Sequence, residues 1–289
     1  MYETFFGLRE KPFALAPDPE FLFLGRHHRR AMILLDYTLS SGTGFALVTG
    51  RVGCGKTTVI RSVLARASQE FTVGLISNTH SGFGNLLPWV ARAIGMKDIA
   101  PSESELYEKF VDFLIAEYAA GRRVVLVIDE AQNLGAAGLE QLRVLSNVNT
   151  GKDLLLQTIL IGQPELRATL AQPQLRQFAQ RIAIEYHMEA LSREETHAYV
   201  RHRLGVAGGN PALFAAEAVE LVHARTGGVP RLINQVCDTA LVYAFGEQRS
   251  PVDAGIVADV LDDRSAGGLL ALGEPVPRES DALAFGVEH

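Results

Sequence analysis

Gly50-Arg-Val-Gly-Cys-Gly-Lys-Thr57 fits the phosphate-loop pattern GxxxxGK[ST] at every fixed position. Glycines let such a loop turn its backbone N–H groups inward around a phosphate, and the N-terminus of a following helix favours negative charge at the same place. The apolar run Phe45–Thr49 before the loop predicts a strand, and Lys56–Ser68 after it predicts a helix. This order of strand, loop and helix predicts a nucleotide-binding site in an α/β fold.

The side chains of the loop have separate predicted tasks. Lys56 is expected to reach the β- and γ-phosphates of ATP, and the Thr57 hydroxyl is expected to join the ligands of Mg²⁺. The residues predicted to bind the nucleotide here are Gly50, Arg51, Val52, Gly53, Cys54, Gly55, Lys56, Thr57 and Thr58.

A second, acidic motif completes the predicted site. The apolar run Val124–Ile128 predicts a buried strand, and it leads directly into Asp129 and Glu130. At the carboxyl edge of a sheet, Asp129 can hold the water shell of Mg²⁺ and Glu130 can polarise the attacking water. Together with the loop, this acid pair predicts a Mg-dependent ATPase.

Polar residues near other predicted elements are further candidates. Gln163 follows a predicted strand, where it can lie between the acid pair and the γ-phosphate or serve only as a turn residue. Arg181 precedes the last predicted strand, and from there it can reach the nucleotide of a neighbouring subunit or remain solvated. The same two readings hold for Arg176. Arg231 begins a later helix and can bend back to the nucleotide.

The order of elements predicts the domain organisation. Apolar strands alternate with helices as far as about residue 188, which indicates a parallel sheet covered on both faces. The strands stop at about Ala190, and the helical stretches beyond it begin with a capping-box pattern at Ser192-Arg-Glu-Glu195. The predicted strands are Phe45–Thr49, Phe71–Ile76, Val124–Ile128, Leu154–Ile161 and Ile182–His187. The predicted segments are an aromatic, proline-containing clasp with a helix over 1–40, a core over 41–188, a helical lid over 189–262 and a flexible tail over 263–289.

The composition argues against several other classes of protein. With 47% hydrophobic and 21% charged residues the chain can bury a substantial core, and none of its apolar runs reaches the ~18 residues that a membrane span needs. A secretory signal is not expected, and two cysteines fit a reducing cytosol. The net charge of −6 favours protein partners over DNA, although the basic run Arg26-His-His-Arg-Arg30 leaves nucleic acid as the weaker alternative.

A longer series of motifs resembles the AAA+ ATPases of the ExeA/GspA type, which include relatives from general secretion, pilus biogenesis and exopolysaccharide or protein-sorting loci. The resemblance covers roughly residues 1–250, and it implies a P-loop NTPase fold with a three-layer αβα core, a five-stranded parallel sheet and a C-terminal all-α lid. The segments that carry it are Tyr2-Glu-Thr-Phe-Phe-Gly-Leu-Arg-Glu-Lys-Pro-Phe13, Pro17-Asp-Pro-Glu-Phe-Leu-Phe23, His28-Arg-Arg-Ala31, Asp129-Glu-Ala-Gln132, Gly162-Gln-Pro-Glu-Leu166, Gln180-Arg181, Arg201-His-Arg-Leu204 and Gly228-Val-Pro-Arg231-Leu-Ile-Asn234.

The resemblance also implies roles for single residues. Gln163 corresponds to sensor 1, Arg181 to an arginine finger that acts on a neighbouring subunit, and Arg231 to sensor 2, whereas His28 would lie near the adenine. Arg176 stays open as the alternative finger. The implied assembly is an ATP-promoted homo-oligomer, a ring or an arc, with a protein partner in an inner-membrane export or assembly complex.

Two features depart from the family. GspA-type proteins continue into a membrane span and a periplasmic peptidoglycan-binding region, and because neither is found in this sequence, we expect a short soluble form that is cytoplasmic and peripheral to the inner membrane through its partners. Cys54 replaces the commoner Thr or Ser of the loop. Because the loop needs only a small residue there, we expect a substitution of little effect, with some sensitivity to alkylation through the thiol.

Three functions are therefore weighed. The first is an ATP-hydrolysing AAA+ motor or switch of a secretion, pilus or exopolysaccharide system. The alternative is a nucleotide-gated DNA-binding regulator of the type that selects transposition targets. A binding switch with negligible turnover is the least attractive of the three, because Thr57 and Glu130 are both present.

Overall fold

The computed structural model describes residues 1–16, 18–66, 70–77 and 84–267. Contacts between residues divide the chain into two compact units, one formed by Arg26–Glu189 and the other by Met1–Gly25 together with Ala190–His289. The predicted segment 1–40 is therefore shared between the units, because its helix packs with the sheet while the residues before it pack with the C-terminal helices.

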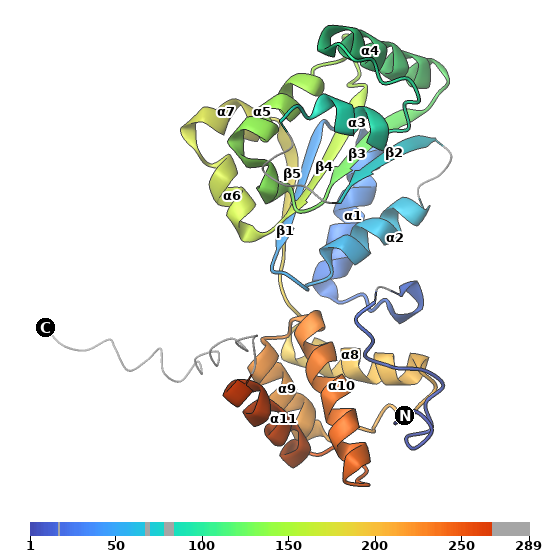
Figure 1. The fold of residues 1–289 in the computed structure, drawn as a ribbon, viewed down its shortest axis with the longest axis vertical. Coiled ribbons are helices and arrows are strands. Elements are labelled where there is room, and N and C mark those ends of the chain that lie inside the picture. Colours follow the sequence, from blue (N-terminus) through green and yellow to red (C-terminus); the bar gives the residue numbers. More distant parts are fainter. Residues whose placement is uncertain (17, 67–69, 78–83, 268–289) are drawn as a thin grey trace, which may run out of the picture. The chain divides into compact units, whose positions relative to one another are not determined.

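The first unit contains one sheet of five parallel strands in the order β2-β3-β4-β1-β5 (Figure 1), which confirms the predicted sheet. Strand β4 begins at Leu156, two residues later than predicted, because Leu154 instead forms an isolated antiparallel bridge with Asn149. The strands are β1 (Phe45–Gly50), β2 (Phe71–Ile76), β3 (Arg123–Ile128), β4 (Leu156–Gly162) and β5 (Ile182–Met188).

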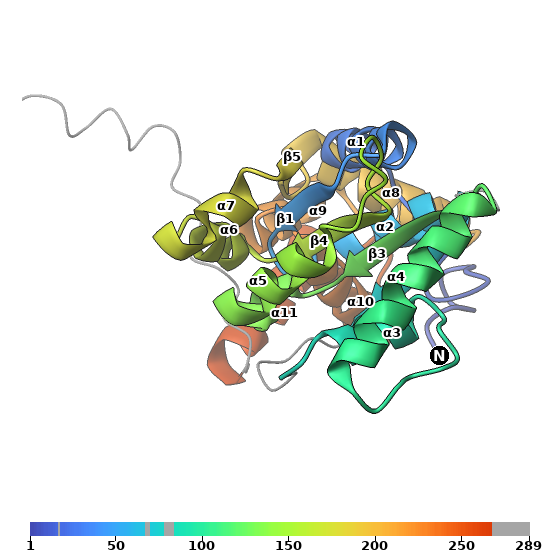
Figure 2. The same ribbon diagram turned by 90° about the horizontal axis from the view of Figure 1, so that it is seen from above.

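Helices cover both faces of this sheet (Figures 1 and 2). Helices α1 and α2 pack against each other and against β1, whereas α3 and α4 contact β2 and β3 from the other side, next to the helices that follow β3 and β4. The helices of the unit are α1 (Arg26–Ser41), α2 (Lys56–Arg66), α3 (Leu87–Ala93), α4 (Glu103–Ala119), η2 (Ala131–Leu134), α5 (Gly135–Leu145), α6 (Pro164–Leu170), η3 (Pro173–Leu175) and α7 (Arg176–Ala179).

The sequence of the strands explains this layering. Every residue of β1 and β4 is buried, including the polar Thr49, Gln157 and Thr158, so both faces of these mostly apolar central strands are covered. Phe45, Leu126 and Leu160 lie in one hydrophobic core with Phe110 of α4 and Phe178 of α7. Burying a side chain of this size contributes roughly 1.5–3 kcal/mol, so the strands hold the loops at their carboxyl ends on a rigid base.

The second unit is helical and takes its core from both ends of the chain. Ser192 and Glu195 form the predicted capping box at the start of its first helix. The Arg203 guanidinium donates to the Ala14 carbonyl oxygen at 3.1 Å and lies 4.5 Å from the ring centre of Phe21, which ties the N-terminal segment to these helices. The helices are η1 (Pro19–Phe21), α8 (Arg193–Val206), α9 (Ala216–Thr226), α10 (Pro230–Gly246) and α11 (Ala254–Gly267).

The predicted tail over 263–289 needs one correction. Helix α11 continues to Gly267, so residues 263–267 are helical, and 268–289 lie outside the described residues. Among the described residues, no helix combines the length and the hydropathy that crossing a membrane requires.

Candidate nucleotide-binding and hydrolysis site

The phosphate loop lies between the end of β1 and the start of α2, as predicted. Its turn depends on glycine, because the backbone of Gly53 has φ +80° and that of Gly55 has φ +95°, in the left-handed region that other residues rarely adopt. A Cβ added at Gly55 would lie 2.9 Å from Nε2 of His28. The loop is therefore closed by a neighbouring helix as well as by its own conformation.

His28 reaches the loop from α1. Its side chain is buried, and Nε2 lies 3.0 Å from the backbone carbonyl oxygen of Cys54. Since a carbonyl oxygen only accepts, Nε2 carries the proton in this contact. The structure thus places His28 against the backbone of the phosphate loop; its predicted position near an adenine stays a prediction.

The side chain of Lys56, the first residue of α2, folds back into the phosphate loop. Only 6% of the residue is exposed, and its Nζ donates to the carbonyl oxygens of Gly50 at 2.7 Å and of Arg51 at 3.0 Å. A buried ammonium is costly unless it is hydrogen-bonded, and carbonyl dipoles compensate it less well than a phosphate does. This arrangement suits an anion-binding site.

Thr57 and Asp129 come together from α2 and the end of β3. The Thr57 hydroxyl donates to Oδ2 of Asp129 at 2.7 Å, and Asp129 is 6% exposed. Hydroxyl and carboxylate oxygens are ligands that Mg²⁺ accepts, and Mg²⁺ typically needs only one or two protein ligands besides phosphate and water. This pair fits the predicted Mg²⁺ position, and the described residues contain no cluster of three or more His, Cys, Asp or Glu for a larger cage.

Glu130 follows Asp129 in an unusual conformation. Its backbone is left-handed, with φ 53° and ψ 39°, and its N–H donates to Oδ1 of Asp129 at 3.0 Å. Burial raises the pKa of the Glu130 carboxyl, but hydrogen bonds from Gln132 and Gln163 and the charge of Lys56 outweigh it, so that the pKa lies below its ordinary value. Glu130 is therefore ionised at neutral pH, as a proton acceptor must be.

Gln163 lies directly after β4 and reaches the acid pair. Its Nε2 donates to Oε2 of Glu130 at 3.1 Å, so the structure brings this predicted residue to the site. The prediction missed a catalytic-site neighbour, Gln132, whose Nε2 donates to the same oxygen of Glu130 at 2.5 Å. Gln132 stands in the Asp-Glu-x-Gln motif, but nothing in the sequence shows that the chain turns back there.

Arg181 lies at the opposite edge of the sheet. It precedes β5 and donates to the side chain of Asn147 and, at 3.4 Å, to the carbonyl oxygen of Arg143. Since β1 has six residues, the two edges are roughly 20 Å apart, too far for Arg181 to reach the loop of its own chain. Arg176 begins α7 on the same side and is also exposed.

Arg231 belongs to the helical unit. It is the second residue of α10, follows Pro230, and is exposed. Its role as sensor 2 stays a prediction.

The thiol of Cys54 is shielded from solvent. The residue is 1% exposed, and burial raises the pKa of the thiol despite the nearby charge of Lys56. Both features suppress the thiolate, so the predicted sensitivity to alkylation is not supported.

Comparisons of sequence agree with the resemblance noted above. A protein-family profile described as "AAA domain" matches residues 39–170. General secretion pathway protein A from Aeromonas hydrophila is 44% identical over 246 residues, which are 85% of this chain and 45% of that protein. The chain thus spans less than half the length of this curated relative.

Solved structures agree with the fold. Cdc6p from Pyrobaculum aerophilum has a TM-score of 0.66 at 16% identity, over 87% of this chain and 70% of that one. The ORC2 protein of Aeropyrum pernix has a TM-score of 0.64 at 17% identity, over 90% and 73%. The RuvB Holliday junction branch migration motor of Thermotoga maritima has a TM-score of 0.53 at 16% identity, over 86% and 72%. At such identities these likenesses concern the fold alone, and they confirm the predicted P-loop α/β class.

Proposed function

Because this chain belongs to the ExeA/GspA-type AAA+ ATPases, we propose that it binds ATP with Mg²⁺ and hydrolyses it. The observation that carries the proposal is the hydrogen bond between Thr57 and Asp129 directly beside an ionised Glu130. A P-loop protein that only bound phosphate would have no need of a carboxylate held in this position.

The residues of the loop bind the phosphates. Lys56 exchanges its two carbonyl partners for phosphate oxygens, and the inward N–H groups of the loop supply the remaining donors. Thr57 and Asp129 would hold Mg²⁺, which neutralises charge on the β- and γ-phosphate oxygens when it is bound.

Glu130 is the general base of the proposed reaction. It accepts a proton from the attacking water, whose oxygen forms a bond to the γ-phosphorus while the bond from that phosphorus to the bridging oxygen breaks, giving ADP and phosphate. Gln163 would donate to the γ-phosphate as sensor 1, and its contact with Glu130 supports this role.

We further propose that the working form is a homo-oligomer, a ring or an arc, promoted by ATP. Arg181 lies too far from its own phosphate loop to act there, so it would complete the site of a neighbouring copy; Arg176 is the alternative finger. In the same proposal the helical unit is a lid, and Arg231 reports the nucleotide state to it as sensor 2.

The biological role is proposed from the curated relative. We propose that hydrolysis drives a protein partner of a secretion, pilus or exopolysaccharide assembly system, and that the protein works in the cytoplasm, held at the inner membrane through that partner. The DNA-binding alternative is not favoured, since the curated relative is a secretion-pathway protein and the ORC2, Cdc6p and RuvB structures are less than 20% identical to this chain.

Two variants test the ATPase. Lys56→Ala is expected to lose nucleotide binding, measured by equilibrium titration with a fluorescent ATP analogue. Glu130→Gln is expected to bind ATP as tightly as the parent protein and to release phosphate about 10²- to 10⁴-fold more slowly. Undiminished turnover in Glu130→Gln would refute the mechanism.

Partners captured on the ATP-trapped Glu130→Gln protein would test the proposed biological role. Turnover that DNA strongly stimulates and that depends steeply on salt would instead support the DNA-binding alternative.

A further inference from the structure

We propose that Gln132 is a positioning residue for hydrolysis, whose side-chain amide fixes the Glu130 carboxylate and couples it to the turn that carries Gln163. This inference rests on the proposed ATPase function and concerns the same site. It concerns a residue that touches neither ATP nor water in our proposal and acts only through Glu130.

The inference rests on a closed set of three hydrogen bonds. Gln132 Nε2 donates to Oε2 of Glu130 at 2.5 Å, and Gln132 Oε1 accepts from the backbone N–H of Gln163 at 3.1 Å. The side chain of Gln163 returns to the same Glu130 oxygen at 3.1 Å. Fixing Oε2 from two sides sets the plane of the carboxylate, so a displacement at the end of β4 is transmitted to the base.

The end of β4 is shaped to admit this amide. A Cβ added at Gly162 would lie 2.9 Å from Oε1 of Gln132 and 2.6 Å from a methyl carbon of Leu166. The φ of Gly162 is not positive, so its backbone does not require glycine. Glycine is needed here because a side chain would fill the space that Gln132 and Leu166 occupy. The closeness of packing gives Gln132 a defined position.

Only an amide of this length meets both requirements. A donor must face Glu130 and an acceptor must face the N–H at the start of α6; a glutamate lacks the donor and adds a negative charge, and a methionine lacks both. Gln132→Met therefore removes the contacts at nearly constant size, and Gln132→Glu replaces an attraction by a repulsion.

The chain offers a matched control in Gln141 of α5. Its amide likewise makes one hydrogen bond as acceptor and one as donor, from the Leu86 N–H at 2.8 Å and to the Gly84 carbonyl oxygen at 2.9 Å, but both partners are backbone groups away from the acid pair. Gln141→Met thus removes the same chemistry from the same layer of the fold without touching Glu130.

Steady-state turnover and ATP binding of these variants test the inference. Gln132→Met is expected to lower kcat about 10- to 100-fold with the affinity for ATP unchanged, since misplacing a reacting group by about 1 Å has such an effect. Gln132→Glu should lose more, and Gln141→Met should keep kcat within about twofold. In the Glu130→Gln background, Gln132→Met should cause no additional loss, because the two residues act as one unit.

The outcomes separate this inference from the function on which it rests. If the parent protein shows no turnover, or a turnover that does not depend on Glu130, the proposed ATPase function and the positioning role are both overturned. Normal turnover in the parent and an unchanged or raised kcat in Gln132→Met overturns the positioning role alone. An equal loss in Gln141→Met, or a further loss in the Glu130→Gln background, would show a general structural effect and would also overturn it.

Discussion

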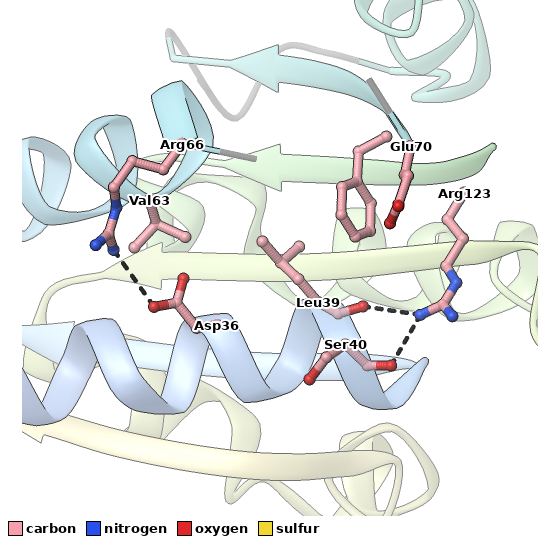
Figure 3. A pocket seen from close by; sticks show the side chains of 8 residues that line it. Asp36, Leu39, Ser40, Val63, Arg66, Glu70 and Arg123 are labelled. Carbon is pink, nitrogen blue, oxygen red and sulfur yellow. Dashed lines mark hydrogen bonds and ion pairs between the residues drawn. The ribbon is translucent and has the colours of Figure 1, made fainter. Parts of the chain in front are cut away.

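The two edges of the sheet use polar side chains in different ways. At the carboxyl edge, Lys56 and Asp129 are buried; Lys56 donates to carbonyl oxygens of its own loop, and Asp129 accepts from the Thr57 hydroxyl. At the amino edge, a pocket of about 480 Å³ is lined by both apolar and charged residues, the charged ones being Asp36, Arg66, Glu70 and Arg123 (Figure 3). Arg123 there donates to the carbonyl oxygens of Leu39 and Ser40 at 3.0 and 2.9 Å, at the end of α1.

This contrast indicates that the charged residues at the amino edge serve the stability of the fold. The carbonyl oxygens of the last turn of a helix have no hydrogen-bond donor within the helix. Arg123 supplies donors to two of them, which is a structural role that does not depend on a ligand. Arg66 and Asp36, 3.3 Å apart in the same pocket, are more than half exposed and contribute little. Changes at the amino edge should therefore alter stability, and changes at the carboxyl edge should alter nucleotide chemistry, with Arg181 as the proposed exception.

Arg181→Ala gives the largest expected effect and breaks the simple form of this comparison. An arginine finger is worth about 10³–10⁵ in kcat, so turnover should nearly vanish while ATP binding and stability remain. Because the finger would act on a neighbouring copy, mixing Arg181→Ala with Lys56→Ala protein should restore part of the phosphate release. Arg176→Ala is the parallel variant, and a failure of complementation with Arg181→Ala alone would move the role to Arg176.

Gly55→Ala sharpens the comparison at the carboxyl edge. The positive φ of Gly55 and the approach of His28 predict about 1–3 kcal/mol of strain, which corresponds to about a 10- to 100-fold weaker affinity for ATP. Gly121→Ala is the control, because Gly121 also has a positive φ, of 75°, but no atom within 4 Å of an added Cβ. Equilibrium titration should show an affinity loss in Gly55→Ala only; equal affinities would contradict the proposed closed loop.

Arg123→Ala tests the amino edge directly. Losing two charge-assisted hydrogen bonds at the end of α1 should lower the free energy of unfolding by about 1 kcal/mol, which chemical denaturation can measure. The affinity for ATP should not change. A variant of parental stability but weaker nucleotide binding would reverse the assignment of the two edges.

Glu117→Gln gives an effect on stability as small as that of Arg123→Ala and adds a pH dependence. Hydrogen bonds from Arg122 and Thr72, in spite of burial, lower the pKa of Glu117 to about 2. A carboxyl with a depressed pKa contributes its full stabilisation above its ordinary pKa of 4.5, and this stability is lost as the pH falls toward 2. Glu117→Gln should thus be less stable by about 1 kcal/mol at pH 7, and the difference should vanish near pH 2. A difference that is constant from pH 7 to pH 2 would exclude this origin.

The residues of the candidate nucleotide site lie in two short segments of the sequence, so the contacts among them were largely predictable. The spacing of the glycines predicts a phosphate loop. The apolar run before Asp129 and Glu130 predicts a strand whose end places both acids at the same edge of the sheet as that loop. Parallel strands bring those segments together whatever else the chain does. The contact of Thr57 with Asp129 follows from these local patterns alone.

The role of Gln132 was not predictable, because it depends on one backbone conformation. Glu130 is left-handed, and the short helix that follows it carries Gln132 back to the acid side chain and to the end of β4. Neither hydrophobic periodicity nor motif spacing in the sequence predicts a single left-handed residue such as Glu130. The close approach that Gly162 permits is likewise a property of packing.

The sequence by itself determined the parallel α/β core, its phosphate loop and its acid pair, since short-range patterns of glycine, apolar and acidic residues fix strands, loops and helix starts. Tertiary packing decided other contacts between elements, beyond that of Thr57 with Asp129. It joined Met1–Gly25 to the C-terminal helices in one unit, bridged Glu130 and Gln163 through Gln132, and set Arg181 at the far edge from its own loop. The reason is that these contacts join residues from separate elements or depend on a single backbone turn, and such pairings depend on packing and burial that no local pattern records.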